Sequence, residues 1–337
     1  MSIHETDVVI VGAGPAGLFS IFQCGMLKLK THVVDVLDVV GGQCQALYPE
    51  KYVYDIPAHP KLMAQDLVER LKEQAAPFSP TYHLGQQVVS LSRAEDKRWH
   101  VGLSDGTTLI APAIIIAAGC GSFGPNRPPL AGIEAYEGTS VHYFVARREE
   151  YRDKNVVIAG GGDSAVDWAL NLVEVAKRVM VVHRRPKFRA APDSEAKLQS
   201  LASQGALDLV VPYQLHGLEG ANGTLTAVTV STLEGEVKTL PADSLLAFFG
   251  MSMDLGPIAT WNLAMEGAHI AVNPATMQTN HEGVFAVGDI CTYPGKLKLI
   301  LSGFAEAAQA AHNAFTTVHP GQALHIEHSS TAGVPTK

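Results

Sequence analysis

Short apolar runs and longer amphipathic stretches alternate along this chain. Runs of mostly β-branched residues predict buried parallel strands at 8–11, 31–35, 155–159 and 179–183. Apolar segments with the length of a helix follow the first and third runs, at 18–26 and 166–175. Strand, helix and strand in this order predict an α/β fold built on parallel sheets.

The rest of the chain supplies further elements of both kinds. Apolar residues at helical spacing predict helices at 60–72, 194–203 and 303–315. Runs typical of strands lie at 83–91, 99–103, 107–109, 113–119, 207–211, 225–231, 243–249 and 283–289. Glycine-rich segments after residue 119 and at 250–256 are expected to connect domains.

A glycine-rich turn, GAGPAG at 12–17, joins the first strand to its helix. In such a turn Gly12 makes the tight bend, Gly14 lets the backbone approach a pyrophosphate, and Gly17 lets the helix pack on the strand. Asp35 ends the second strand about 20 residues further on, where a carboxylate can bind the hydroxyls of a ribose. A glycine turn without function is the alternative, but this context predicts a dinucleotide site formed by Gly12, Gly14, Pro15, Ala16, Gly17 and Asp35.

The same order of elements returns with GGGDSA at 160–165. Here a basic segment, HRRPKFR at 183–189, follows the second strand in place of an acidic residue. Arginine can bind a 2′-phosphate through paired hydrogen bonds, whereas a carboxylate would repel it. A solvated basic turn is the alternative, but the position favours an NADP site formed by Gly160, Gly162, Asp163, Ser164, Ala165, His183, Arg184, Arg185 and Arg189. Two such sites on one chain suggest a flavoprotein that carries FAD and takes electrons from NADPH.

Length, charge and cysteine content narrow the class of protein. A chain of 337 residues predicts two domains, and a net charge of −8 argues against general binding to nucleic acid. Polar residues precede the first apolar run, and no run is long enough for a membrane span, so we expect neither signal peptide nor membrane segment. The four cysteines are scattered without a CxxC pair, which favours a cytoplasmic protein without a dithiol or metal site.

Several motifs in order resemble the pyridine nucleotide–disulfide oxidoreductase superfamily, in its small thioredoxin-reductase-like branch. They are the two glycine turns, Gly-Gly-Gln at 41–43, Ala-Ala-Gly at 117–119, His-Arg-Arg at 183–185 and Val-Gly-Asp-Ile at 287–290. The resemblance implies two Rossmann-like, three-layer ββα domains, with an NADPH domain inserted in a split FAD domain. The implied segments are FAD-binding 1–118, NADPH-binding 119–249, FAD-binding 250–318 and a C-terminal extension at 319–337.

The chain departs from thioredoxin reductases where they carry a CxxC pair, because this chain has SVHYFVARR at 140–148. Without a dithiol, electrons cannot pass from a flavin to a protein disulfide by thiol exchange. The segments at 46–55, 161–169, 183–190 and 288–296, with His328-Ser329-Ser330, are instead similar to the thioredoxin-reductase-like ferredoxin/flavodoxin–NADP⁺ reductases.

This resemblance assigns roles to single residues around FAD. Asp35 is expected to bind the adenosine ribose, with Gln43 and Val88 lining that site, and Asp289 to bind the ribityl or pyrophosphate part. Tyr48 and His328 are expected to stack on opposite faces of the isoalloxazine ring, with Phe123 and Ser330 nearby. Alternatively, Tyr48 packs on the core and His328 is solvated. No protein side chain is expected to be catalytic, because the flavin carries the chemistry.

The implied reaction is hydride transfer between NADPH and FAD, followed by one-electron transfer to a carrier protein. The implied partners are ferredoxin or flavodoxin and a second copy of the chain in a homodimer. A flavin monooxygenase is an alternative, because Tyr136-x-Gly138-x-x-x-His142 partly matches that class, and so is a flavoprotein that senses NADPH. A docking face for an acidic carrier could be formed by Arg147, Arg148, Arg152, Lys154, Lys296 and Lys298.

Overall fold

The computed structural model describes residues 2–324 and 333, apart from the side chains of 122, 123 and 251–253. The chain divides into two compact units, which we describe separately. Unit 1 is formed by the residues up to 123 together with those from 253 onward, and unit 2 by residues 124–252.

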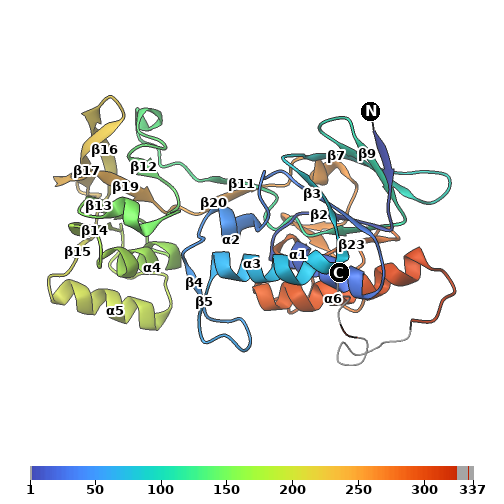
Figure 1. The fold of residues 1–337 in the computed structure, drawn as a ribbon. Helices are drawn as coiled ribbons and strands as arrows, with labels where there is room; N and C mark the ends of the chain where they lie inside the picture. The colour runs from blue at the N-terminus through green and yellow to red at the C-terminus, as the bar shows by residue number, and fades with distance from the viewer. Residues whose placement is uncertain (1, 325–332, 334–337) are drawn as a thin grey trace. The chain divides into compact units, whose positions relative to one another are not determined.

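Parallel strands form the central sheet of unit 1 in the order β23-β10-β2-β3-β6. Their bounds are Val284–Ala286 for β23, Ala113–Ile116 for β10, Val8–Val11 for β2, Thr31–Asp35 for β3 and Thr81–Leu84 for β6. The helices on one face are α1 (Pro15–Met26), α3 (Ala64–Ala75) and α6 (Ile300–Val318), which lie side by side in Figure 1. Every residue of β2 and β10 is buried, which explains why both strands are continuous apolar runs.

A second sheet covers the other face of this parallel sheet. Its order is β1-β9-β8-β7, with bounds Ile3–Glu5 for β1, Thr108–Ala111 for β9, Trp99–Leu103 for β8 and Val88–Arg93 for β7. Apolar side chains of the two sheets meet in one buried cluster that includes Val9, Val101 and Ile114. Unit 1 therefore has three layers: helices, a parallel sheet and a second sheet.

Short elements complete unit 1 around the edges of these layers. The helical ones are α2 (Gly42–Ala46) and the 3₁₀ turns η1 (Ala76–Phe78), η4 (Gly256–Thr260) and η5 (Gly288–Ile290). The short strands are β4 (Tyr52–Val53), β5 (Leu62–Met63), β21 (Met265–Glu266), β22 (His269–Ala271) and β24 (Cys291–Thr292). The helix expected at 60–72 was placed too early, because Leu62 and Met63 pair with β4 before α3 begins at Ala64.

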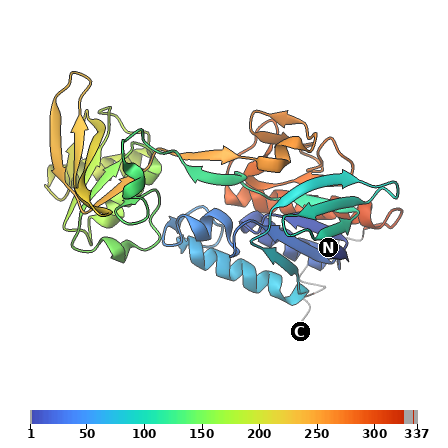
Figure 2. The ribbon, with the colours of Figure 1, turned by 90° about the horizontal axis from the view of Figure 1, so that it is seen from above.

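Unit 2 repeats the plan with a parallel sheet in the order β12-β19-β13-β14-β15. Its strands are Val141–His142 (β12), Ser244–Ala247 (β19), Asn155–Ala159 (β13), Arg178–Val182 (β14) and Asp208–Val210 (β15). Helices α4 (Asp163–Leu172) and α5 (Pro192–Ser203) pack on one face, and the 3₁₀ turns are η2 (Ile133–Ala135) and η3 (Arg148–Tyr151). The other face carries an antiparallel sheet of β16 (Gln214–Ala221), β17 (Thr224–Ser231) and β18 (Val237–Pro241), coloured yellow to orange in Figure 2.

The chain crosses between the units twice, and both crossings are extended. Ser122–Pro125 forms β11 and Met251–Asp254 forms β20, and the two strands pair with each other. The glycine-rich segments expected to connect domains thus contain paired strands. Within residues 2–324, no helix combines the length and the apolar character needed to cross a membrane.

Three histidines cluster in unit 1 where β1 meets the parallel sheet. His32 Nδ1 and His83 Nε2 lie 3.0 Å apart, and the ring of His4 lies within 5.8 Å and 6.0 Å of their ring centres. Burial, together with the neighbouring imidazoles, lowers the pKa of His32 below its usual 6.5. The pKa of His83 is lowered by burial and by His4, while Asp105 opposes this shift. The cluster is therefore stable when neutral and is disfavoured when protonated.

We expect the free energy of unfolding to fall as the pH drops below about 6.5, because the unfolded chain then binds protons that the folded cluster resists. His32→Gln should reduce this pH dependence, since it removes an imidazole whose pKa is lowered by burial and by both of the other imidazoles. Urea unfolding between pH 5 and pH 8 measures the effect. His59→Gln, outside the cluster, serves as the control. An unchanged slope in His32→Gln would show that other groups cause the dependence.

Candidate functional site

The first glycine turn lies where β2 ends and α1 begins. Gly12 has φ +109°, and a Cβ there would overlap the carbonyl oxygen of Ala117. A Cβ on Gly17 would overlap the carbonyl oxygen of Gly12, so α1 could not approach β2. By contrast, a Cβ on Gly14 would meet only the Cα of Gly42, at 3.9 Å. The turn is therefore packed tightly on its inner side and open at Gly14.

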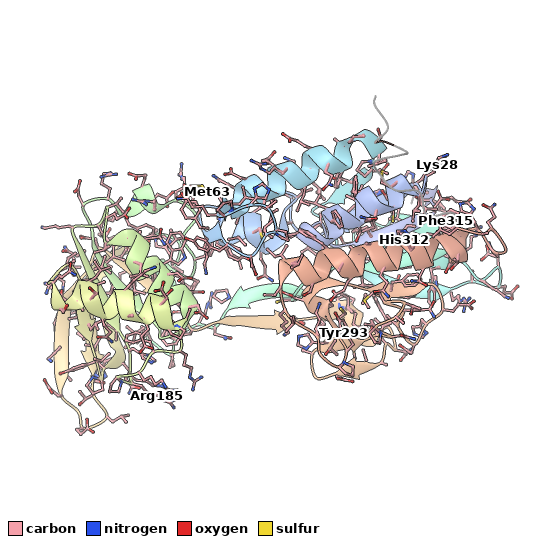
Figure 3. All side chains as sticks on the ribbon, turned by 90° about the horizontal axis from the view of Figure 1, so that it is seen from below. Lys28, Met63, Arg185, Tyr293, His312 and Phe315 are labelled. Carbon is pink, nitrogen blue, oxygen red and sulfur yellow. The ribbon has the colours of Figure 1, made fainter. Side chains whose placement is uncertain are left out.

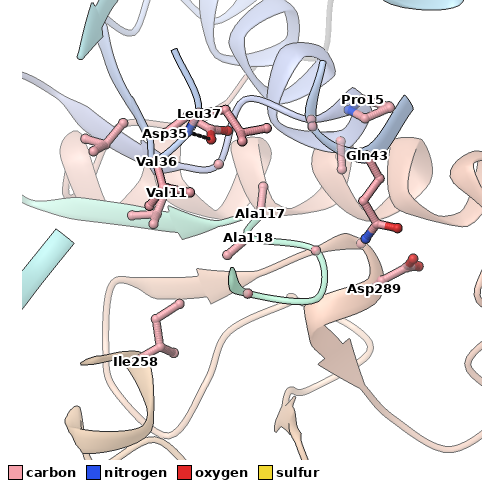
Figure 4. Close-up of a pocket in the computed structure, with 18 of the residues that line it drawn as sticks. Val11, Pro15, Asp35, Val36, Leu37, Gln43, Ala117, Ala118, Ile258 and Asp289 are labelled. Carbon is pink, nitrogen blue, oxygen red and sulfur yellow. Dashed lines mark hydrogen bonds between the residues drawn. The ribbon is translucent and has the colours of Figure 1, made fainter. Parts of the chain in front are cut away.

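The open side of this turn faces a pocket in unit 1, at the carboxyl ends of β2, β3 and β10 (Figure 4). Asp35 lies toward one end of the pocket in this view, while Gln43 and Asp289 lie toward the other. Most of the residues expected to bind FAD line it: Gly12, Gly14, Pro15, Ala16, Asp35, Gln43, Tyr48, Val88 and Asp289. Gly17 does not line it, Phe123 has no described side chain, and His328 and Ser330 fall outside the described residues.

Backbone N–H groups fix the Asp35 carboxylate at the end of β3. Ala13 N donates to Oδ2 at 2.6 Å, and Leu37 N donates to Oδ1 at 2.9 Å. Burial raises the pKa of Asp35, whereas these backbone hydrogen bonds lower it. Each carboxylate oxygen has a further lone pair, so the side chain can still accept hydrogen bonds from a ligand hydroxyl in the pocket.

The second glycine turn joins β13 to α4 in unit 2. A Cβ on Gly160 would lie 2.7 Å from the carbonyl oxygen of Phe248, and one on Gly161 would overlap the ring of His183. Outside the adjoining residues, no atom of the described chain lies within 4 Å of a Cβ on Gly162. Gly162 is also the N-cap of α4, and since glycine has no side chain, no capping group competes with an anion for the first N–H groups of this helix. In both turns the first glycine, Gly12 or Gly160, is packed closely against the protein, and the glycine two residues later is open.

The basic segment after β14 is bound to this turn by backbone hydrogen bonds. Arg189 N donates to the carbonyl oxygen of Gly161 at 2.6 Å, and Ala191 N donates to Asp163 Oδ1 at 2.9 Å. Phe188 is buried in the core of unit 2, and its ring lies 5.1 Å from that of His183. One carboxylate oxygen of Asp163 is therefore used to hold the end of the basic segment, and only the other is left for a ligand.

Three exposed arginines of this segment have no acidic partner within the described residues: Arg184, Arg185 and Arg189. Arg185 is labelled in Figure 3 at the edge of unit 2. Apart from Arg70, the other arginines pair with carboxylates, and these are Arg93, Arg98, Arg127, Arg147, Arg148, Arg152 and Arg178. The unpaired cluster lies beside the open glycine turn, as a site for a phosphate group requires.

Comparison with known proteins is consistent with this pair of sites. Residues 6–316 match the model of the pyridine nucleotide-disulphide oxidoreductase family. The chain belongs to this family. It is 69% identical over 335 residues to a protein of Paramagnetospirillum magneticum named ferredoxin–NADP reductase, covering 99% of both chains. A protein of Rhodospirillum rubrum with the same name is 59% identical over 334 residues, covering 98% of this chain and 97% of that one.

Solved structures show the same fold. The thioredoxin reductase of Lactococcus lactis superposes with a TM-score of 0.78 at 24% identity, covering 93% of this chain and 99% of that one. The thioredoxin reductase of T. acidophilum gives 0.79 at 22% identity, covering 93% of this chain and 98% of that one. The family resemblance and the two-domain dinucleotide-binding fold predicted from the sequence are thus confirmed.

The cysteines of this family member are all unpaired: Cys24, Cys44, Cys120 and Cys291. Cys44 lines the unit 1 pocket and lies 3.8 Å from the hydroxyl of Tyr48, another pocket residue. Burial raises the pKa of Cys44 to about 11 and raises that of Tyr48 as well. At neutral pH the thiol is protonated and therefore a poor nucleophile.

The pockets also include residues that the sequence did not indicate. In unit 1 they include Gln86, Gln87 and Ile258. In unit 2 a second pocket joins the glycine turn and His183 to Pro129 and Tyr213. Gln86 and Gln87 directly precede Val88, which was expected to bind FAD, and this position was the only sign in the sequence that they lie near the site. The other residues reach the pockets from distant parts of the sequence.

The prediction of a docking face for an acidic partner is wrong for Lys296 and weakened for three arginines. Lys296 is buried, with 5% of its side chain exposed, and pairs with Glu306. Arg147, Arg148 and Arg152 form ion pairs with Glu150, Glu174 and Glu149, in that order, which neutralises much of their charge.

Proposed function

We propose that this chain is an FAD-dependent ferredoxin–NADP⁺ reductase. The observation that carries the proposal is the pair of open glycine turns, one beside the fixed carboxylate of Asp35 and the other beside arginines without an acidic partner among the described residues. Absence of a CxxC pair argues against delivery of electrons to a disulfide. The names of the close relatives in P. magneticum and R. rubrum support the same reaction.

The residues of the unit 1 pocket fit the binding of FAD. The backbone at Gly14 has the space that a pyrophosphate needs, and the N-terminus of α1 favours its negative charge. Asp35 can accept hydrogen bonds from ribose hydroxyls, while Gln43, Asp289 and Tyr48 line the rest of the pocket. Bound FAD supplies the conversion between a two-electron hydride and single electrons. Phe123, His328 and Ser330 are further proposed contacts.

Unit 2 fits the binding of NADP(H). Its turn at Gly160, Gly162, Ser164 and Ala165 offers an open backbone and the N-terminus of α4 to the pyrophosphate. Arg184, Arg185 and Arg189 supply positive charge for the 2′-phosphate, and Asp163 holds their segment in place. His183 lines the pocket beside them, and burial lowers its pKa, with the arginine charges adding to the shift. The imidazole is therefore neutral at pH 7 and adds no charge.

We propose that residues 1–118 and 250–318 form the FAD domain, that 119–249 form the NADPH domain, and that 319–337 extend over the flavin. A homodimer, a cytoplasmic location and ferredoxin or flavodoxin as carrier complete the proposal. The unpaired state of all four cysteines supports a reducing compartment.

The purified protein should be yellow and should release FAD on denaturation. NADPH-dependent reduction of cytochrome c should be slow alone and stimulated at least about tenfold by ferredoxin or flavodoxin, because the carrier relays single electrons. Comparing the two carriers identifies the partner. Oxygen-dependent hydroxylation of a substrate would favour a flavin monooxygenase. Binding of NADPH with negligible turnover by either carrier would favour a sensor.

A further inference from the structure

A buried carboxylate lies directly behind the unit 1 pocket. Glu306 is on α6, and only 3% of its side chain is exposed. It pairs with the ammonium group of Lys296, of which 5% is exposed. Burying two charges is costly unless hydrogen bonds satisfy both oxygens. Apolar side chains in these two positions would avoid this cost, so we infer that the pair has a role other than stability.

All the described partners of this carboxylate come from one segment, residues 288–296. Gly288 N donates to Oε2 at 2.7 Å, and the thiol of Cys291 lies 3.5 Å from the same oxygen. The Tyr293 hydroxyl donates to Oε1 at 2.7 Å, and Lys296 Nζ donates to that oxygen as well. Tyr293 is labelled beside α6 in Figure 3. One side chain thus anchors both the start and the end of the segment.

The start of this segment is the turn that carries Asp289. Gly288 has φ +75°, and a Cβ there would lie 3.3 Å from the Cβ of Ala16 on α1. Gly303 of α6 is equally close, since its Cβ would lie 3.4 Å from Ala16. Gly288, Asp289 and Gly303 all line the pocket. The hydrogen bond from Gly288 to Glu306 therefore sets the direction in which Asp289 leaves the turn.

We propose that Glu306 is a positioning residue for FAD, which acts by holding the turn at 288–291 so that Asp289 faces the pocket. The inference rests on the proposed function, because it assigns Asp289 to the flavin site. Lys296 balances the charge of Glu306 in the buried position, and Tyr293 orients its second oxygen. Glu306 itself does not line the pocket.

The test compares two double variants that both remove the buried ion pair. In E306L/K296M no acceptor remains for Gly288 N–H, whereas in E306Q/K296M the amide oxygen of glutamine can keep the hydrogen bond. We expect the Kd of FAD for the apoprotein to rise about tenfold in E306L/K296M, as loss of one buried hydrogen bond predicts. In E306Q/K296M it should return to within about threefold of the wild type. Quenching of flavin fluorescence on binding gives the Kd.

A second readout asks whether Glu306 acts through Asp289. Asp289→Asn is measured alone and in the E306L/K296M background. Because the two changes affect one contact, the combined loss of FAD affinity should be smaller than the product of the separate losses. Equal affinity in both double variants, or losses that multiply, would overturn the inference.

If E306L/K296M does not fold, the same cycle is measured with E306M/K296M, in which methionine keeps the length of the glutamate side chain but offers no acceptor to Gly288 N–H, and losses that multiply again overturn the inference. Uptake of FAD by the wild-type apoprotein distinguishes failure of this inference from failure of the proposed function. A wild-type apoprotein that takes up no FAD would refute the proposed function before any variant is compared.

Discussion

Gly14→Ala is expected to give a folded protein that has lost FAD. The new Cβ meets no protein atom closer than 3.9 Å, so the fold tolerates it, but it fills the space where the backbone would approach a pyrophosphate. Loss of one or two hydrogen bonds to a charged phosphate predicts an affinity for FAD about a hundredfold lower. The absorbance of the purified protein near the flavin bands and fluorescence titration of the apoprotein measure the loss.

Gly162→Ala is the matched control, because Gly162 is the N-cap of α4 as Gly14 is of α1, and its Cβ would have no described atom within 4 Å outside the neighbouring residues. This variant should retain FAD and lose affinity for NADP⁺, whereas Gly14→Ala should still bind 2′,5′-ADP. Each change should cost about 1 kcal/mol of stability or less, as replacement of an N-cap glycine by alanine predicts. If either variant lost both ligands, the two sites would not be independent.

Replacing Arg184 and Arg185 together by glutamine should abolish the preference for NADPH over NADH. Neither arginine has an acidic partner in the described part of the chain, so the change breaks no ion pair there and removes only charge available to the 2′-phosphate. Two charge-assisted hydrogen bonds to phosphate predict a KM for NADPH roughly a hundredfold higher, with the KM for NADH nearly unchanged. Steady-state kinetics with both nucleotides and a ferredoxin acceptor give the comparison.

Arg70→Gln is the control for this change, because Arg70 is an exposed arginine of α3 in unit 1 that also has no ion pair in the described structure. It alters the charge of the chain without altering unit 2, and both KM values should stay at their wild-type levels. A double variant that still preferred NADPH would remove these arginines from the phosphate site.

The elements around both glycine turns could be predicted because their signals are local. A β-branched strand, a glycine turn and a helix follow one another within a short stretch, and β2, β3, β13 and β14 occur where the apolar runs lie. The reaction class inferred from those motifs agrees with the names of the close relatives. The placement of the cofactor residues is still a prediction, although most of them line the two pockets.

Elements whose stability depends on distant partners could not be predicted. Strand β11 contains glycine and proline, and β20 contains serine and aspartate; the two form because the two crossings of the chain pair with each other. The edge strand β16 reads QLHGLEGA, which is mostly exposed and lacks the apolar alternation that predicts a strand, although its partner β17 follows directly in the chain. Glu306 presents the same difficulty, because a glutamate in a helix usually faces water, and only the folded segment 288–296 surrounds it.

The central claim is that electrons from NADPH leave this chain for a carrier protein without passing through a thiol pair. An anaerobic titration followed by absorbance tests it most directly. NADPH should bleach the bound flavin. Oxidised ferredoxin or flavodoxin should then restore its colour in proportion to the amount of carrier added. A small disulfide, such as oxidised dithiothreitol, should restore none of the colour. A flavin that the disulfide reoxidises and the carriers leave bleached would contradict the claim.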